Sequence, residues 1–244
     1  MIELNPALDV SALAADYAVR RRLQVRDFLT EQAAEHVLGM MKRLPWGLAL
    51  NDGPRVAELD AAALAKLTQA DAQRIIAGVH ERARMSYQFI YAYYPLFARY
   101  FRSGAAREPL FEAYEFMNSE PVLAFARRLT GISGIRWADA QATSFRAGHF
   151  LKYHTDEVPS QKRAAAYVLN LTKGWGRDWG GFLQFFNERY DVEEAYRPAW
   201  NALNVFTIPA DHSVGVVAPY VQAERLSLTG WFREDDPPGP IGGR

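Results

Sequence analysis

Residues 153–156 read Tyr-His-Thr-Asp, residues 209–212 read Pro-Ala-Asp-His, and residues 225–231 read Arg-Leu-Ser-Leu-Thr-Gly-Trp. These pieces lie in a region where short runs of β-branched and aromatic residues alternate with turn residues. The runs are 135–140, 142–145, 150–154, 165–171, 181–186, 202–208, 213–217 and 226–232. About eight short strands at this spacing indicate a sandwich or a double-stranded β-helix rather than an α/β sheet.

The sequence before this region has a helical texture. Residues 1–45 are expected to be helical, with Thr30 as the N-cap of a helix over 31–43, and residues 46–59 are expected to be extended. Asp60 and Thr68 are placed to start two further helices, and Ser119 starts another that Gly131 ends. The aromatic stretch 86–101 is expected to pack in the core, with the lining of a substrate cleft as the alternative.

No change in composition marks a linker near residue 133, so we expect a single α+β domain over residues 1–244 with a mainly β core. Helical support is expected over about 1–133, and the β core, a sandwich or a double-stranded β-helix (jelly roll), over about 134–233. Residues 234–244 read as a tail.

The composition excludes several kinds of site. The 28 basic and 28 acidic residues balance, so bulk charge indicates neither a nucleic-acid partner nor an anionic membrane. The absence of cysteine excludes disulfides, thiolate metal sites and cysteine nucleophiles. The start of the chain does not have the pattern of a secretory signal, and no apolar run is long enough to span a bilayer. We therefore expect a cytoplasmic protein; nothing in the sequence indicates its oligomeric state.

His154 and Asp156 lie two residues apart on a segment expected to be extended, so their side chains point the same way. A second histidine from another strand, His212, would complete a set of two imidazoles and one carboxylate. Such a set holds one face of an octahedral metal and leaves the other positions open, as in non-haem Fe(II) oxygenases. A His-x-Asp pattern alone is weak, and a surface histidine beside a turn is the alternative. Asp211 is a rival carboxylate, but as the neighbour of His212 it would face the opposite way.

Arg225 and Ser227 share one face of the last expected strand by alternation. An arginine on a buried inner face requires an anion, because an unpaired guanidinium there costs several kcal/mol. A dicarboxylate ligand would suit the planar fork of Arg225. The alternative is a structural partner such as Glu224 or Glu188, and Arg233 is the second candidate for the anchor.

Taken in order, these motifs resemble the prolyl 4-hydroxylase-like branch of the Fe(II)- and 2-oxoglutarate-dependent dioxygenases. Within that branch the chain is similar to the group that acts on a prolyl residue of a ribosomal protein. The resemblance covers about a third of the chain and rests on His154-Thr155-Asp156, Tyr167-Val168-Leu169-Asn170, Asp178-Trp179-Gly180-Gly181-Phe182-Leu183, Pro198-Ala199-Trp200-Asn201, His212 and Arg225-Leu226-Ser227-Leu228-Thr229-Gly230-Trp231-Phe232.

The resemblance implies a double-stranded β-helix (jelly roll) in which His154, Asp156 and His212 hold Fe(II). It also implies that Arg225, helped by Ser227, binds the distal carboxylate of 2-oxoglutarate. It implies O2 as the second cosubstrate and ascorbate as a reductant. The implied reaction is hydroxylation of a prolyl residue or a proline-like substrate, with release of succinate and CO2. The substrate could be a protein, a peptide or an amino acid.

Two positions depart from the family pattern. Phe145 and Val168 stand where members of the family often have a tyrosine that contacts the cosubstrate. The remaining contacts to 2-oxoglutarate therefore stay open. Two alternative functions also stay open: a cupin-like metalloenzyme that does not use 2-oxoglutarate, and a non-catalytic jelly-roll binding module.

Overall fold

The computed structural model describes residues 2–52, 55–102 and 107–242. Within these residues 13 strands join in one continuous antiparallel sheet. The strands are β1 Arg22–Val25, β2 Gly47–Asp52, β3 Arg55–Leu59, β4 Phe89–Tyr94, β5 Trp137–Ala138, β6 Gln141–Phe145, β7 Phe150–His154, β8 Arg163–Asn170, β9 Leu183–Phe186, β10 Val192–Tyr196, β11 Ala202–Thr207, β12 His212–Val214 and β13 Arg225–Arg233.

The sheet curls over into two facing layers. One layer runs β1-β11-β8-β13-β6-β4, and the other runs β7-β12-β9-β10. Strand β4 joins the layers, because it pairs with β6 on one side and with β7 on the other. Apolar side chains from both layers, such as Phe206 and Phe185, pack between them. This is a double-stranded β-helix, one of the two architectures that the strand spacing indicated and the one that the resemblance implied.

The two ends of the curled sheet meet side by side. Strands β1 and β10 do not pair through their backbones; instead Arg22 of β1 binds Glu193 and Glu194 of β10, with Nε 2.7 Å from Glu194 Oε2. The guanidinium of Arg22 also lies over the ring of Phe185, 4.9 Å from its centroid. Side chains therefore complete a nearly closed barrel around the space between the layers.

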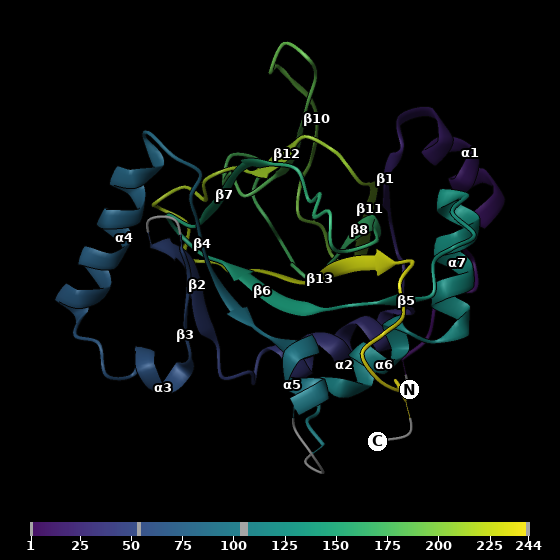
Figure 1. Cartoon of the computed structure of the whole chain (residues 1–244), viewed down its shortest axis with the longest axis horizontal. Helices are drawn as coiled ribbons and strands as arrows, with labels where there is room; N and C mark the ends of the chain where they lie inside the picture. Colours follow the sequence, from purple (N-terminus) through teal and green to yellow (C-terminus); the bar gives the residue numbers. More distant parts are fainter. Residues whose placement is uncertain (1, 53–54, 103–106, 243–244) are drawn as a thin grey trace.

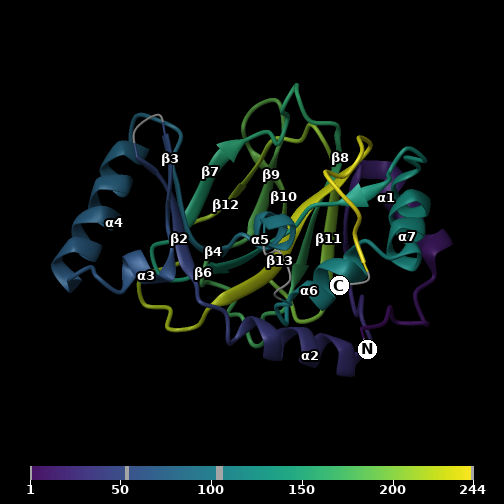
Figure 2. The same cartoon turned by 60° about the horizontal axis from the view of Figure 1, so that its bottom comes forward.

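The helices cover the outside of this barrel. They are α1 Val10–Arg20, α2 Glu31–Met41, α3 Ala61–Leu64, α4 Gln69–Ala83, α5 Leu96–Arg102, α6 Phe111–Met117 and α7 Glu120–Thr130. Helices α2, α5 and α6 lie beneath the layer that contains β6 and β13, α1 and α7 lie together at one flank, and α4 lies at the other flank beside β2 (Figures 1 and 2). None of the helices in the described residues has the length and apolar sequence required to cross a membrane.

The largest hydrophobic cluster joins these helices to the sheet. It includes the fully buried side chains of Tyr17, Phe28, Tyr114, Tyr167 and Phe232. The space between the two sheet layers holds a separate cluster, so the helical layer and the barrel interior form distinct cores.

Local capping explains where the helices start. Thr30 accepts a hydrogen bond from Ala33 N, Asp60 accepts one from Ala63 N, and Thr68 forms a reciprocal capping box with Asp71. These contacts satisfy backbone N–H groups that a helix leaves unpaired at its first turn. These three predicted helix starts are confirmed, and so is the fourth, because α7 has Ser119 as its N-cap and Gly131 as its C-cap.

The first 133 residues contribute strands as well as helices. Arg22–Val25, within the stretch expected to be helical, forms β1, and part of the aromatic stretch forms β4. Strand β10 and helix α6 were also not predicted. These elements are short, and β1 and β10 lie at sheet ends, where pairing with distant segments outweighs weak local preference.

Candidate active site

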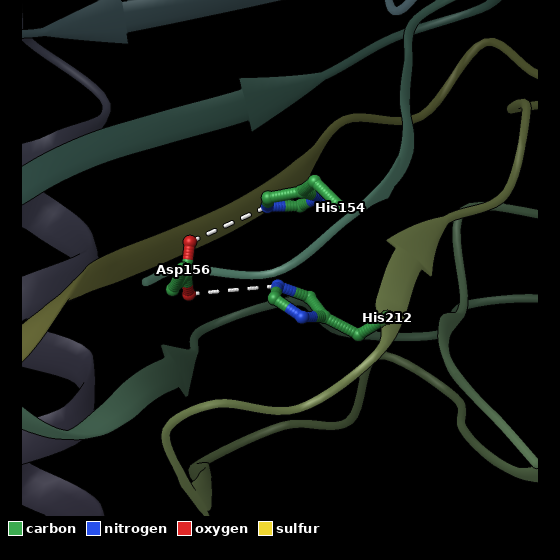
Figure 3. Close-up of side chains that lie close together, drawn as sticks. All are labelled: His154, Asp156 and His212. Carbon is green, nitrogen blue, oxygen red and sulfur yellow. Dashed lines mark ion pairs between the residues drawn. The ribbon is translucent and has the colours of Figure 1, made fainter. Parts of the chain in front are cut away.

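The strand pairing between β7 and β12 brings two histidines together. His154 is the last residue of β7, His212 is the first residue of β12, and they are direct partners in the register. Their ring centroids lie 4.1 Å apart. Asp156 follows two residues after His154 and turns its carboxylate toward both rings (Figure 3). The structure thus brings all three predicted ligands to one point.

The distances within this triad suit a metal ion. Asp156 Oδ1 lies 3.3 Å from His154 Nε2, and Asp156 Oδ2 lies 3.5 Å from His212 Nε2. One ligand atom of each residue lies within 4.8 Å of the others. Two nitrogen donors and one oxygen donor on one side of a cavity fit the facial arrangement used for non-haem Fe(II).

Backbone contacts set the protonation of both rings. His154 Nδ1 lies 2.9 Å from the carbonyl of Lys152, and His212 Nδ1 lies 2.8 Å from the carbonyl of Ala210. Because a carbonyl can only accept, Nδ1 of each ring carries the proton. The lone pair is then on Nε2, the atom that faces Asp156, and the same contacts fix the ring orientations.

The electrostatics of the triad favour the forms that bind metal. Burial raises the pKa of Asp156, but the neighbouring imidazoles of His154 and His212 outweigh burial and hold this pKa below its usual value. Burial lowers the pKa of His212. A carboxylate and a neutral imidazole are the protonation states that metal binding requires.

The triad opens into a cavity of about 590 Å³ between the two sheet layers. Arg225, the first residue of β13, lies at its closed end with only 2% of its surface exposed. Its Nε and Nη1 atoms are buried without a hydrogen-bond partner, and its Cζ lies 5.1 Å from the ring centroid of Phe145. Burial lowers the pKa of Arg225 to about 10, so the side chain stays charged at neutral pH.

The structural partners considered for Arg225 are engaged elsewhere. Glu224 binds Arg146 at 3.0 Å, and Glu188 lies in an exposed turn. Arg233, the second candidate for the anchor, binds Asp139 and Asp235. Arg225 is therefore a buried cation that faces a cavity and lacks a carboxylate partner in the described part of the chain.

Ser227 follows Arg225 along the same face, as alternation predicted. It is fully buried, lines the cavity, and lies within hydrogen-bond distance of Thr143, whose Oγ1 is 3.4 Å from Ser227 Oγ. Phe145 and Val168 also line the cavity. The walls beside Arg225 are thus apolar at both positions where the resemblance would place a tyrosine.

Part of the aromatic stretch 86–101 lines the cavity, which was the alternative to the expected packing in the core. Tyr87, Phe89 and Tyr91, on and just before β4, are the lining residues. Tyr91 stacks on Phe145 at 5.1 Å and on Phe89 at 5.4 Å, which makes a continuous aromatic wall. The signal was the alternate spacing of these rings, whereas Tyr94 of the same strand faces the core.

Sequence reasoning missed the role of Arg163. Its guanidinium lies over the ring of Trp231, 3.5 Å from the centroid, and its Nη1 donates to the backbone carbonyl of Asp156 at 3.0 Å. Arg163 thereby holds the short segment that carries the carboxylate ligand. Sequence alone could not identify it, because the contact depends on how the loop after β7 folds back.

Comparisons with known proteins agree with this site. The sequence model of the 2OG-Fe(II) oxygenase superfamily matches residues 140–233, which include every residue of the triad and Arg225. A mouse protein, prolyl 3-hydroxylase OGFOD1, is 27% identical over 133 residues, which are 52% of this chain and 24% of that protein. The chain thus spans about a quarter of the length of this relative.

Two solved structures share the fold. A prolyl-4-hydroxylase from Pseudomonas putida superposes with a TM-score of 0.58 at 20% identity, covering 93% of this chain and 100% of the other. A prolyl hydroxylase from Trichoplax adhaerens, solved with a peptide of hypoxia inducible factor, gives a TM-score of 0.58 at 14% identity, covering 92% and 89% of the two chains. The predicted fold and the predicted resemblance to the 2-oxoglutarate oxygenases are confirmed.

Proposed function

We propose that this chain, whose residues 140–233 match the 2OG-Fe(II) oxygenase superfamily, is an Fe(II)- and 2-oxoglutarate-dependent dioxygenase that hydroxylates proline in a peptide or protein. One observation carries the proposal. The triad of His154, Asp156 and His212 and the unpaired cation Arg225 line the same buried cavity. A metal site alone does not require Arg225, but a cosubstrate that binds metal at one end and carries a free carboxylate at the other does.

The residues of the triad would hold Fe(II), and Arg225 with Ser227 would hold the distal carboxylate of 2-oxoglutarate. With both bound, the site would supply an O2-dependent oxidation in which one oxygen atom enters a C–H bond and the other enters succinate, with loss of CO2. Burial strengthens the ion pair between Arg225 and the carboxylate, because water is excluded and does not compete for either charged group.

The protein's own contribution is orientation and exclusion of water. The Nδ1–H bonds of His154 and His212 to backbone carbonyls hold both rings in place. The ring of Phe206 lies 4.7 Å from that of His212, and the stacked rings of Phe145 and Tyr91 line the cavity with apolar surface. A dry, shaped cavity limits side reactions of the oxidant.

A prolyl substrate is supported by the relatives rather than by a residue of this chain. The mouse relative is a prolyl 3-hydroxylase, the Pseudomonas putida structure is a prolyl-4-hydroxylase, and the Trichoplax adhaerens enzyme was solved with a peptide. The requirement for ascorbate and the cytoplasmic location stay predictions. Stimulation of multiple-turnover succinate release by ascorbate would test the first of them.

An anaerobic absorption spectrum with Fe(II), before and after addition of 2-oxoglutarate, tests the proposal. The expected result is a visible metal-to-ligand charge-transfer band for the wild type. Arg225→Ala should keep the metal but weaken 2-oxoglutarate binding about 100-fold, since it leaves the buried carboxylate unpaired. Arg146→Ala is the matched control, because Arg146 binds Glu224 outside the cavity and should leave the band unchanged.

Metal binding is checked separately with Mn(II) by electron paramagnetic resonance. Asp156→Ala removes the only carboxylate of the triad and should abolish binding at micromolar metal, whereas Asp211→Ala, beside His212 but outside the cavity lining, should not. Iron binding without a band would instead favour a metalloenzyme that does not use 2-oxoglutarate. If Asp156→Ala bound metal as tightly as the wild type, the triad would not be the metal site.

A further inference from the structure

The cavity has a closed end and an open end. Arg225 marks the closed end with 2% exposure, whereas two other lining residues, Val56 and Tyr87, are 61% and 42% exposed. Tyr87 also lies beside the metal triad, with its ring 5.8 Å from that of His154. A substrate that reaches the metal from solvent therefore passes the strand pair β2–β3 and the segment before β4.

Asn51, near the end of β2, lies at this open end. It pairs with Val56 across the β2–β3 register, and its Nδ2 donates to the backbone carbonyl of Tyr87 at 3.3 Å. The donor side of its amide is thus used within the protein. Arg82 fixes the backbone beneath it by donating from Nη2 to the carbonyl of Asn51 at 2.9 Å.

The acceptor side of the same amide is unused. Asn51 Oδ1 is buried without a hydrogen-bond partner, the residue is only 7% exposed, and it lines the cavity. Leaving a buried acceptor unpaired costs about 1–3 kcal/mol, so such an atom is expected to have a partner in the bound state. Because the cation Arg82 already binds the backbone carbonyl of Asn51, a second cation is disfavoured there, and the fitting partner is a neutral N–H donor.

We infer that Asn51 is a substrate-binding residue whose Oδ1 accepts a hydrogen bond from a main-chain N–H of the peptide. The inference rests on the proposed function and adds to it the residue that binds the peptide backbone beside the reacting proline. A proline within a peptide has no N–H of its own, so the donor belongs to a flanking residue. Free proline lacks this flanking donor.

Binding of capped peptides to a form of the protein that cannot turn over tests the inference. The protein is loaded with Zn(II) and 2-oxoglutarate and titrated calorimetrically with acetyl- and amide-capped pentapeptides that carry a central proline. Each flanking amide of the tightest binder is then replaced in turn by an ester, which removes one N–H. In the wild type, one ester position should weaken binding about fivefold to tenfold, the effect of one lost hydrogen bond.

Variants of Asn51 identify the acceptor. Asn51→Ala should weaken binding of the all-amide peptide by the same factor and show no further loss with the ester. Asn51→Asp keeps an acceptor oxygen but loses the N–H that donates to the carbonyl of Tyr87. It should therefore still bind the ester peptide more weakly than the all-amide peptide. If Asn51 only positioned Tyr87, Asn51→Asp would not show this difference. Gln88→Ala is the matched control: Gln88 is a buried amide with an unpaired Oε1 in the same region, but it does not line the cavity.

The outcomes separate this inference from the proposed function. If no ester position weakens binding to the wild type, or if Gln88→Ala matches Asn51→Ala, the role of Asn51 is overturned. The same holds if the protein shows the charge-transfer band with Fe(II) and 2-oxoglutarate but binds free L-proline and none of the capped peptides. Absence of that band overturns the proposed function, and the inference with it.

Discussion

Arg225 carries a buried positive charge that lacks a counter-ion in the described part of the chain. Its Nε and Nη1 atoms lack partners, and burial already lowers its pKa to about 10. A buried ion without a counter-ion destabilises the protein that carries it, so binding function here works against stability. The two properties should be separable by substitution.

Replacing Arg225 by Met keeps most of the side-chain length and removes the unpaired charge. The free energy of unfolding, measured in urea without 2-oxoglutarate, should rise by about 1–3 kcal/mol, because an apolar group replaces an uncompensated buried ion. Added 2-oxoglutarate with Mn(II) should no longer raise the Tm above the value with Mn(II) alone. Arg146→Met, at a 46% exposed ion pair, should change stability by no more than about 1 kcal/mol. A less stable Arg225→Met protein would show that Arg225 has a structural partner.

Local alternation predicted the residues that share an element with the site. Arg225 and Ser227 face the cavity because they lie two apart on β13, and His154 with Asp156 follow the same rule at the end of β7. Asn51 could not be found in this way, because its role depends on pairing between segments far apart in the sequence. Spacing within an element is a local property, whereas the assembly of a cavity wall is not.

The connector between β8 and β9 contains two glycines with similar backbone conformations but different surroundings. Gly174 and Gly180 both have positive φ, at 66° and 68°. A Cβ on Gly180 would lie 2.0 Å from the backbone oxygen of Val216, whereas a Cβ on Gly174 would meet nothing within 4 Å. The connector therefore packs closely against the segment that follows β12 and His212.

This pair of glycines gives a matched test. Gly174→Ala should cost about 1–2 kcal/mol, the strain of a left-handed conformation for a residue with a Cβ. Gly180→Ala adds a backbone collision to the same strain, so it should lower the free energy of unfolding by at least about 2 kcal/mol more. Urea denaturation of the two variants measures the difference. Equal losses would mean that the connector moves away from Val216 freely.

At the scale of the whole molecule, the mainly helical N-terminal half also contributes strands to the sheet of the C-terminal half. Strand β4 lies between β6 and β7, so a strand from the N-terminal half completes the sheet that carries the metal triad. Composition could not show this, because an aromatic stretch such as 86–101 suits a core strand and a core helix equally. Burial also shifts the pKa values of two titratable groups outside the triad, in opposite directions.

Asp139 and His149 are both buried, with 8% and 7% exposure. Burial raises the pKa of Asp139 to about 6, although the backbone N–H of Trp231 and the charges of Arg233 and Arg163 act in the other direction. Burial lowers the pKa of His149 to about 4 against a hydrogen bond to the carbonyl of Ser144, and Arg146 and His80 lower it further. The usual values are about 3.9 for Asp and about 6.5 for His.

These shifts make opposite contributions to stability between pH 4 and pH 6. The raised pKa of Asp139 means that its contribution is complete below about pH 4 and is lost as the pH rises through about 6. The lowered pKa of His149 means that its contribution is complete above about pH 6.5 and is lost as the pH falls through about 4. Each group changes the free energy of unfolding by about 1.4 kcal/mol per pH unit, with opposite sign, so the two slopes offset each other in the wild type.

Single substitutions should expose each slope. Relative to the wild type, Asp139→Asn should gain about 3 kcal/mol of stability as the pH rises from 4 to 6, because the wild type alone must then ionise a buried carboxyl. His149→Gln should gain a similar amount relative to the wild type as the pH falls from 6.5 to 4, because only the wild type then keeps a buried imidazole from protonating. Urea denaturation at half-unit steps of pH measures both. Curves that run parallel to the wild type would show that these groups titrate alike in the folded and unfolded chains, while a double variant that tracks the wild-type slope would confirm that the two effects offset each other.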